Sequence, residues 1–340
     1  MIEIDGSYGE GGGQILRMSI ALSALLKKPV RITNIRAKRP NPGLRRQHIT
    51  AIEVVKKICD GSAKGLQEDS ILVEFYPGKI VGGEHIFNIG TAGSITLVLQ
   101  ACILPSLFAE KETKLVLTGG TDVKWSPPWD YFQHVFLPLL KKMGIDIEAK
   151  LLRRGYYPKG MGKVEVTIQP CKEIRPLSFQ NGELNIKGIV HIANLPIQIA
   201  QRVKNSAEKE IERRGIESSI AIQEGYAHSP GIGIVLWASN GKIIGADCLG
   251  ERGLPAEAVG RNAAQRLIKE IEAGVDVDER GVDHILPYMA LAAPSSFTCR
   301  EISRHAETEM WLLEKFLNVK FEIKEEKEKK EVKVLRYMKK

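Results

Sequence analysis

Three segments of this 340-residue chain share one pattern, a glycine-containing turn followed by a mostly apolar stretch of helical length. They occupy residues 9–26, 90–108 and 281–293. Similar segments at wide spacing indicate a weak threefold internal repeat of one supersecondary unit. Strand-like runs alternate with helical patterns between them, at residues 2–4, 30–35, 71–76, 114–118 and 163–169. We therefore predict a mixed α/β (α+β) fold whose repeats build one large body.

A second α/β unit interrupts this pattern. Residues 172–182 are loop-like, and the chain from there to about residue 278 alternates strands with two helices whose first turns contain Pro196 and Pro255. Proline is well tolerated at that position of a helix. Because the third repeat-like segment follows this unit, we predict an insertion. The large domain would comprise residues 1–180 and 278–340, and the small inserted domain residues 181–277.

Composition narrows the functional classes. The chain is 43% hydrophobic and 26% charged, as expected of a soluble globular protein. Its net charge of +8 is compatible with a polyanionic substrate but is not specific for one. The N-terminus lacks the features of a signal peptide, and apolar runs stay well short of the ~20 residues of a membrane span, so we expect a cytoplasmic protein. The five dispersed cysteines suggest neither a disulfide framework nor a zinc site.

Glycines at residues 9–13 precede a helix that carries Arg17. Bare amides, a helix N-terminus and a cation together suit a phosphate group. The segment is neither a Walker A loop nor a dinucleotide fingerprint, and a tight strand-to-helix turn is an equal alternative. Glu10, an acid among backbone donors, could hold a divalent metal that bridges nucleotide phosphates.

A basic loop follows at residues 36–48, where five cations lie beside a turn rich in proline and glycine. Arginines ordered by such a turn suit two-pronged contacts with phosphate. A solvated basic loop is the alternative, and Gln47 and His48 could simply cap the next helix.

These two segments closely resemble the RNA 3'-terminal phosphate cyclase family. The resemblance rests on D-G-x-x-G-E-G-G-G-Q-I-L-R at residues 5–17 and R-x-x-R-P-x-P-G-L-R-x-Q-H at residues 36–48. It continues through residues 90–94 with Gln100, 118–122, 126–131, 154–162 and 193–196, and through Asp283 with residues 287–292. Two positions depart from the family pattern. Met161 replaces the middle of three glycines, and Arg280 stands where bacterial relatives have an aromatic residue that stacks on adenine.

The resemblance implies a fold and a reaction. The large domain should contain three repeated βαβαββ units, as in enolpyruvyl transferases, and the inserted domain should resemble the C-terminal domain of bacterial initiation factor three. The reaction would be ATP-dependent: a histidine takes AMP, passes it to an RNA 3'-phosphate, and the neighbouring 2'-hydroxyl then closes a 2',3'-cyclic phosphate.

The resemblance also implies roles for individual residues. His305 matches the family's nucleophilic histidine, and a neutral imidazole offers a free ring nitrogen near pH 7. Residues expected to bind ATP are Arg17, Gln100, Leu249, Asp283 and His284. Those expected to bind the phosphate of the RNA substrate are Arg36, Arg39 and Gln47. Glu10 would hold Mg²⁺ or Mn²⁺.

Two alternatives remain. One is a non-catalytic relative that acts in ribosome assembly, a class that lacks the histidine present here as His305. The other is an enolpyruvyl-transferase-like enzyme, which needs no adenylylated histidine and whose motifs are not visible. The expected partners are RNA 3'-phosphate ends without a membrane, and a homo-oligomer stays open.

Overall fold

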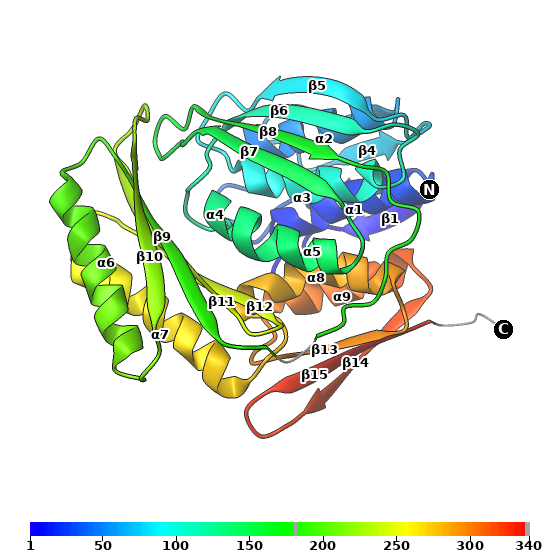
Figure 1. Ribbon diagram of the computed structural model, residues 1–340. Helices are drawn as coiled ribbons and strands as arrows, with labels where there is room; N and C mark the ends of the chain where they lie inside the picture. The colour runs from blue at the N-terminus through cyan, green and yellow to red at the C-terminus, as the bar shows by residue number, and fades with distance from the viewer. Residues whose placement is uncertain (180–181, 337–340) are drawn as a thin grey trace.

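The computed structural model of the chain describes residues 1–179 and 182–336 (Figure 1). It confirms the predicted mixed α/β class, with several small sheets packed against helices. The predicted domain boundary between residues 180 and 181 lies outside the described residues.

The first two sheets have the same strand order. In the first sheet the order is β1 (Ile2–Asp5), β2 (Val30–Thr33), β4 (Val73–Tyr76) and β3 (Ser62–Lys64), with β1 and β2 parallel. In the second it is β5 (Gly83–Asn88), β6 (Thr113–Gly119), β8 (Gly162–Ile168) and β7 (Ile147–Arg153), with β5 and β6 parallel. Each sheet is thus ordered first, second, fourth, third along its own segment of chain.

Helices connect the strands of these two sheets. The first segment has α1 (Gly13–Leu26) and α2 (Arg46–Ile58). The second has α3 (Ile95–Ser106), the short α4 (Trp129–Tyr131), a π-helical turn η1 (Phe132–Phe136) and α5 (Leu137–Lys142).

A third sheet has the order β13 (Ser295–Cys299), β15 (Lys330–Arg336), β14 (Val319–Glu325), and the same segment carries α8 (Glu279–Leu291) and α9 (Arg304–Phe316). Within the described residues this sheet has three strands, where the others have four. The turn expected at Gly281 is not there. Asp278 caps α8 by accepting a hydrogen bond from the amide of Gly281 at 3.0 Å, so Gly281 lies within the first turn of the helix.

Residues 185–273 form a separate α/β unit, on the left in Figure 1. Its sheet has the order β10 (Ser218–Gly225), β9 (Asn185–Ala193), β11 (Gly231–Ser239) and β12 (Ile243–Leu249). Two helices, α6 (Ile197–Glu212) and α7 (Ala256–Ala273), pack on it and on each other. Its buried apolar residues form their own cluster, which runs from Ile186 to Val275 in the sequence.

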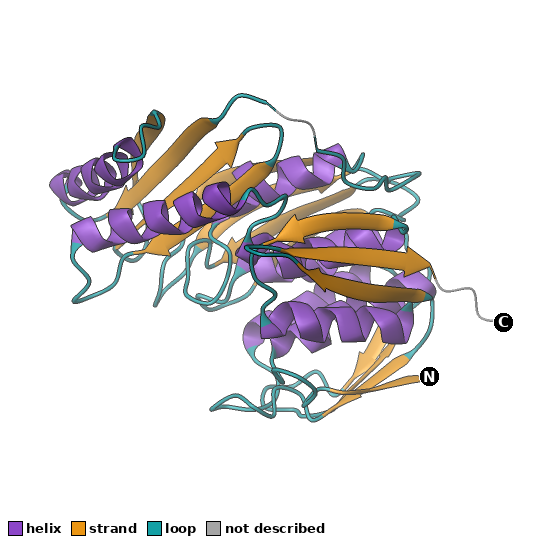
Figure 2. Ribbon diagram, turned by 90° about the horizontal axis from the view of Figure 1, so that it is seen from below, coloured by secondary structure: helices purple, strands orange, loops and turns teal. Residues whose placement is uncertain are grey.

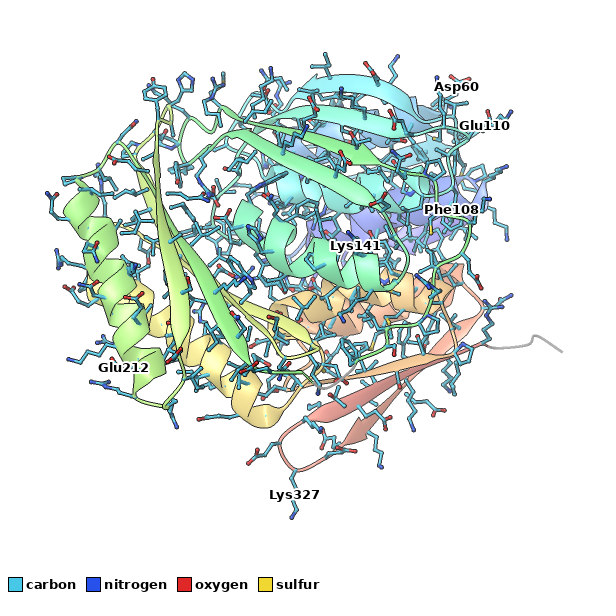
Figure 3. The ribbon with its side chains drawn as sticks, in the orientation of Figure 1. Asp60, Phe108, Glu110, Lys141, Glu212 and Lys327 are labelled. Atoms are coloured by element: carbon cyan, nitrogen blue, oxygen red, sulfur yellow. The ribbon has the colours of Figure 1, made fainter. Side chains whose placement is uncertain are left out.

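The helices of the larger body lie between its sheets (Figure 2). Helix α1 contacts α2, α3 and α9, and its residues from Gln14 to Ala24 are all buried. A helix surrounded in this way is apolar on every face, and the few polar side chains on it must find partners. Charged side chains on the outside, such as Glu212 and Lys327, point into solvent (Figure 3).

None of the helices in the described part of the chain combines the length and the apolar character that crossing a membrane requires.

Candidate active site

The site forms where two loops leave the same edge of the first sheet. Residues 6–12 follow β1 and residues 34–45 follow β2, and these two strands are parallel neighbours. The loops pack without room for side chains between them. A Cβ atom on Gly12 would lie 2.8 Å from the Arg39 guanidinium, and one on Gly11, whose φ is +58°, would lie 2.9 Å from the Lys38 side chain. The glycines therefore let the basic loop lie directly on the first loop.

Glu10 joins this pair of loops to helix α9. One carboxylate oxygen accepts a hydrogen bond from Arg39 at 2.5 Å, and the other lies 2.8 Å from His305 Nδ1. The backbone amide of Glu10 donates to the Thr308 hydroxyl at 3.3 Å. A single carboxylate thus contacts both the predicted nucleophile and a predicted phosphate-binding arginine.

His305 lies in the first turn of α9, which is capped by the Ser303 hydroxyl. Its Nδ1 is 2.9 Å from Gln14 Oε1 as well as 2.8 Å from the Glu10 carboxylate. Both neighbours are acceptors, so Nδ1 carries a proton and is not the nitrogen available to a substrate. The side chain is 43% exposed. The geometry therefore directs Nδ1 to Glu10 and Gln14 and leaves Nε2 as the ring nitrogen that a substrate can reach.

Arg17 and Gln100 form a buried pair behind His305. The Gln100 side-chain oxygen accepts hydrogen bonds from Arg17 at 3.1 and 3.2 Å, and each residue is only 7% exposed. Burial lowers the pKa of Arg17 to about 10, although the carboxyl groups of Glu309 and Asp283 oppose this shift. Arg17 therefore remains a cation at neutral pH.

Helix α8 contributes Asp283 and His284, whose Oδ1 and Nε2 atoms are 3.9 Å apart. Burial lowers the pKa of His284 despite the opposing charge of Asp283. His284 and Gln100 line one side of a small pocket, and its other walls include Pro127, Tyr131 and Phe136. The pocket combines apolar rings with the polar side chains of Thr96, Gln100 and His284, of which Gln100 is bonded to Arg17.

The other predicted residues lie at the border of this region. Gln47 accepts a hydrogen bond from the Ser94 amide at 2.9 Å, which connects the basic loop to the turn before α3. Arg36 donates to the carbonyls of Asn41 and Gly43 at 2.7 and 2.9 Å, so in this structure it holds the shape of the loop.

Leu249 ends β12 on the same strand as Asp247. The carboxylate of Asp247 pairs with Arg280 at 2.5 Å, and the Arg280 guanidinium lies 5.9 Å from the centre of the Tyr131 ring. Arg280 is therefore fixed beside an aromatic ring of the pocket, and Leu249 lies two residues beyond its ionic partner.

Sequence reasoning missed several residues of the site. Gln14 orients His305, and His48 packs so closely on Gly13 that a Cβ there would be 2.4 Å from its ring nitrogen. Burial lowers the pKa of His48 well below its ordinary value, helped by Arg17 and Arg36, so this ring is neutral. His48 Nδ1 accepts from the Arg45 amide, which confirms part of the capping role considered for it.

Glu309 is the other residue that was overlooked. It is fully buried, and burial raises its pKa well above the ordinary range, with Asp283 adding to the effect. Its position four residues after His305 places it on the same face of α9. That four-residue spacing from His305 was the only feature of the sequence that could have indicated Glu309.

The residues present could hold a divalent metal only if the substrate supplied most of its ligands. Among the described residues, no group of three or more His, Cys, Asp or Glu side chains could hold an ion. Mg²⁺ is often bound by one or two carboxylates together with substrate phosphates and water. Glu10 meets that requirement for an ion that arrives with a nucleotide.

An accessible histidine near buried and half-buried arginines suits an α/β enzyme that handles phosphate groups. Comparison with known proteins makes this class specific. The protein-family model described as RNA 3'-terminal phosphate cyclase matches residues 8–323, and the chain belongs to this family.

Proteins named RNA 3'-terminal phosphate cyclase match over nearly their whole length. The protein from Methanosarcina barkeri is 48% identical over 97% of this chain and 98% of its own. The one from Pyrococcus furiosus is 46% identical over 99% of both chains. A bacterial relative from Nitrosospira multiformis is 45% identical over 96% of this chain and 94% of its own.

Proposed function

We propose that this protein converts the 3'-phosphate of an RNA end into a 2',3'-cyclic phosphate, using ATP and a histidine-bound AMP. The observation that carries the proposal is the environment of His305. Glu10 and Gln14 hold a proton on Nδ1, which leaves Nε2 as the attacking nitrogen, and Glu10 also pairs with Arg39.

In the first step, His305 Nε2 attacks the α-phosphorus of ATP. A nitrogen–phosphorus bond forms, the bond to the β-phosphate oxygen breaks, and pyrophosphate leaves. The proton on Nδ1 remains with the ring, where the Glu10 carboxylate stabilises the positive charge that develops. The nearby guanidinium groups offset negative charge on the phosphoryl oxygens.

In the second step, an oxygen of the RNA 3'-phosphate attacks the same phosphorus and takes AMP from His305. The 2'-hydroxyl then attacks the terminal RNA phosphorus, its proton is lost, and AMP leaves. This last attack is intramolecular, and well-oriented reactions of this kind reach effective molarities of about 10⁵ to 10⁸ M. The enzyme therefore contributes most by activating the phosphate.

Glu10 would hold Mg²⁺ or Mn²⁺ together with the triphosphate, and the ion would neutralise phosphate charge. In the structure Arg39 forms an ion pair with Glu10. Once Glu10 has another partner, Arg39 can turn its guanidinium to a substrate phosphate, beside Gln47 and Arg36.

ATP would bind along Gln100, Asp283 and His284, with Leu249 close to the base. The pocket beside Gln100 and His284 offers only about 10 Å³, so the base and sugar would lie outside it. Arg280 is paired with Asp247 and faces the Tyr131 ring. We infer that the Arg280 guanidinium stands in for the aromatic residue of bacterial relatives, because the Tyr131 ring itself is buried.

The finer fold assignments are also proposals. The first two sheets have an identical strand order, and the third, β13-β15-β14, matches its last three positions. These orders support three repeated βαβαββ units as in enolpyruvyl transferases. The separate apolar cluster of residues 186–275 supports an inserted domain of the type in initiation factor three. We propose that the protein acts in the cytoplasm.

A direct assay tests the proposed reaction. The protein is incubated with ATP, Mg²⁺ and an RNA whose 3'-phosphate is labelled, and the product is treated with phosphatase. We expect the label to become phosphatase-resistant only when ATP is present, because a cyclic diester replaces the terminal monoester. Label that stays fully sensitive, with Mg²⁺ and with Mn²⁺, would favour the non-catalytic alternative.

A further inference from the structure

A cleft of about 460 Å³ lies away from His305, between the second sheet and the sheet of the inserted unit. Its walls come from β7 and β8 on one side and from the ends of β9 and β10 on the other, at the upper left of Figure 1. The cleft is within the range of ~300–1,000 Å³ typical of ligand sites. The proposed reaction leaves it without a role.

Two exposed apolar side chains line this cleft. Tyr226 is 69% exposed and Leu152 is 54% exposed. The Tyr226 ring is held edge-on by His228, with ring centres 5.8 Å apart. An exposed aromatic ring in an open cleft is a suitable platform for stacking a nucleic-acid base.

Cations stand next to these apolar side chains. Arg153 and Lys163 line the cleft and are directly opposite each other on β7 and β8. Like charges in cross-strand positions repel, so an anion between them would be stabilising. The Arg153 Nε donates to the Met161 carbonyl at 2.8 Å, which orients its guanidinium. Glu224 is the single acidic residue among those lining the cleft, so the free charge there is positive.

The floor of the cleft is a rigid polar network. Arg154 is 9% exposed and pairs with Asp122 at 3.2 Å and Asp130 at 2.8 Å. It also donates to Gln223 of β10 at 2.8 Å, across the two units. These bonds fix the two walls relative to each other, and they leave Arg153 and Lys163 as the cations available to a ligand.

Closely packed segments connect the cleft with the proposed 3'-phosphate site. The hairpin between β7 and β8 reaches the turn before α3, where a Cβ on Gly160 would be 2.7 Å from Ala92. The same turn touches the basic loop, because a Cβ on Gly93 would be 2.8 Å from Gln47. Tyr157, on the hairpin, is 77% exposed. A strand held at Gln47 by its 3' end can therefore pass over this hairpin.

We propose that the cleft binds the RNA strand upstream of its terminal phosphate, with a base on Tyr226 and backbone phosphate between Arg153 and Lys163. The ligand would be single-stranded, because stacking on a side chain needs a base face that a duplex conceals. This inference rests on the proposed function, since it identifies the part of the substrate beyond the reacting nucleotide.

The first experiment measures binding alone. Fluorescence anisotropy with a dephosphorylated single strand of about 12 nucleotides should show that Tyr226→Ala weakens affinity about tenfold or more, as for loss of one stacked base. Tyr226→Phe should retain affinity because the ring remains. Lys163→Ala should reduce the slope of log affinity against log salt by about 0.7, the effect of one phosphate contact. Lys150→Ala, an exposed lysine of β7 outside the cleft, is the matched control and should leave the slope unchanged.

The second experiment measures KM for 3'-phosphate substrates of increasing length. Tyr226→Ala should raise KM about tenfold for the long RNA and leave a dinucleotide within about twofold, at unchanged kcat. Equal effects on both lengths, or none on binding and KM, would overturn the proposal. Tyr226-dependent binding by a protein that cyclises no RNA would uphold the cleft and refute the proposed function. Cyclisation with the same KM for short and long RNA would uphold the proposed function and refute the cleft.

Discussion

Glu10 is the residue through which the site is connected. It contacts His305 with one oxygen and Arg39 with the other. In this arrangement the carboxylate orients Nδ1 of the proposed nucleophile while it neutralises a guanidinium that, in the proposed reaction, would bind a substrate phosphate. Binding of a metal-loaded nucleotide would therefore change both the charge at His305 and the freedom of Arg39.

A test at the residue scale concerns Arg39. Arg39→Lys should slow cyclisation roughly ten- to a hundredfold in single turnovers started from pre-formed enzyme adenylate. An ammonium makes one point contact where a guanidinium makes two, and a charge-assisted hydrogen bond of ~1.5–3 kcal/mol would be lost. The assay follows phosphatase-resistant product at low and at moderate salt.

Arg46→Lys is the matched control, because Arg46 lies at the end of the same loop, is 63% exposed and pairs with Glu68. It should have little effect. If Arg39→Lys stays within about twofold of the unaltered protein at both salt concentrations, Arg39 makes no direct phosphate contact and the loop is merely solvated.

At the scale of elements, the glycine-rich loop and the start of α1 are shaped by what packs on them. A Cβ on Gly13 would lie 2.4 Å from the buried His48 ring and 3.0 Å from the Arg17 guanidinium. Replacing glycine by alanine at the start of a helix would otherwise be neutral or favourable. At Gly13 the clash with His48 and Arg17 makes the change in stability unfavourable.

Gly13→Ala should therefore lower the free energy of unfolding by about 1–3 kcal/mol, the usual effect of overpacking. It should also reduce adenylate formation, because Arg17 must move. Gly225→Ala serves as the control for thermal unfolding, since its added methyl group would meet no described atom within 4 Å. Equal melting temperatures for the two variants would show that the loop has room that the structure does not show.

The elements that could be predicted from the sequence are those whose apolar residues recur with a clear helical or strand period. The two helices of the inserted unit begin at Ile197 and Ala256, directly after the prolines that predict them, and strands alternate with them as expected. Strand β5 was missed because half of its residues, including the exposed Ile86, face solvent. The turn at Gly281 was wrong because the cap comes from Asp278, three residues earlier.

At the scale of the whole molecule, the site could be predicted only through family resemblance. His305 and Gln14 are 291 residues apart and meet because α1 and α9 pack side by side inside the larger body. Periodicity and spacing describe single elements, so they cannot bring such residues together. For the same reason they gave no sign of the cleft between the second sheet and the inserted unit.

The central claim is that His305 carries AMP, and covalent labelling by α-labelled ATP tests it most directly. We predict one acid-labile label per chain, located on the peptide that contains His305, and its loss in His305→Ala. The side chain is 43% exposed, so the variant should remain folded, which thermal unfolding will check. Undiminished labelling of a folded His305→Ala protein, or a label found on another residue, would contradict the account.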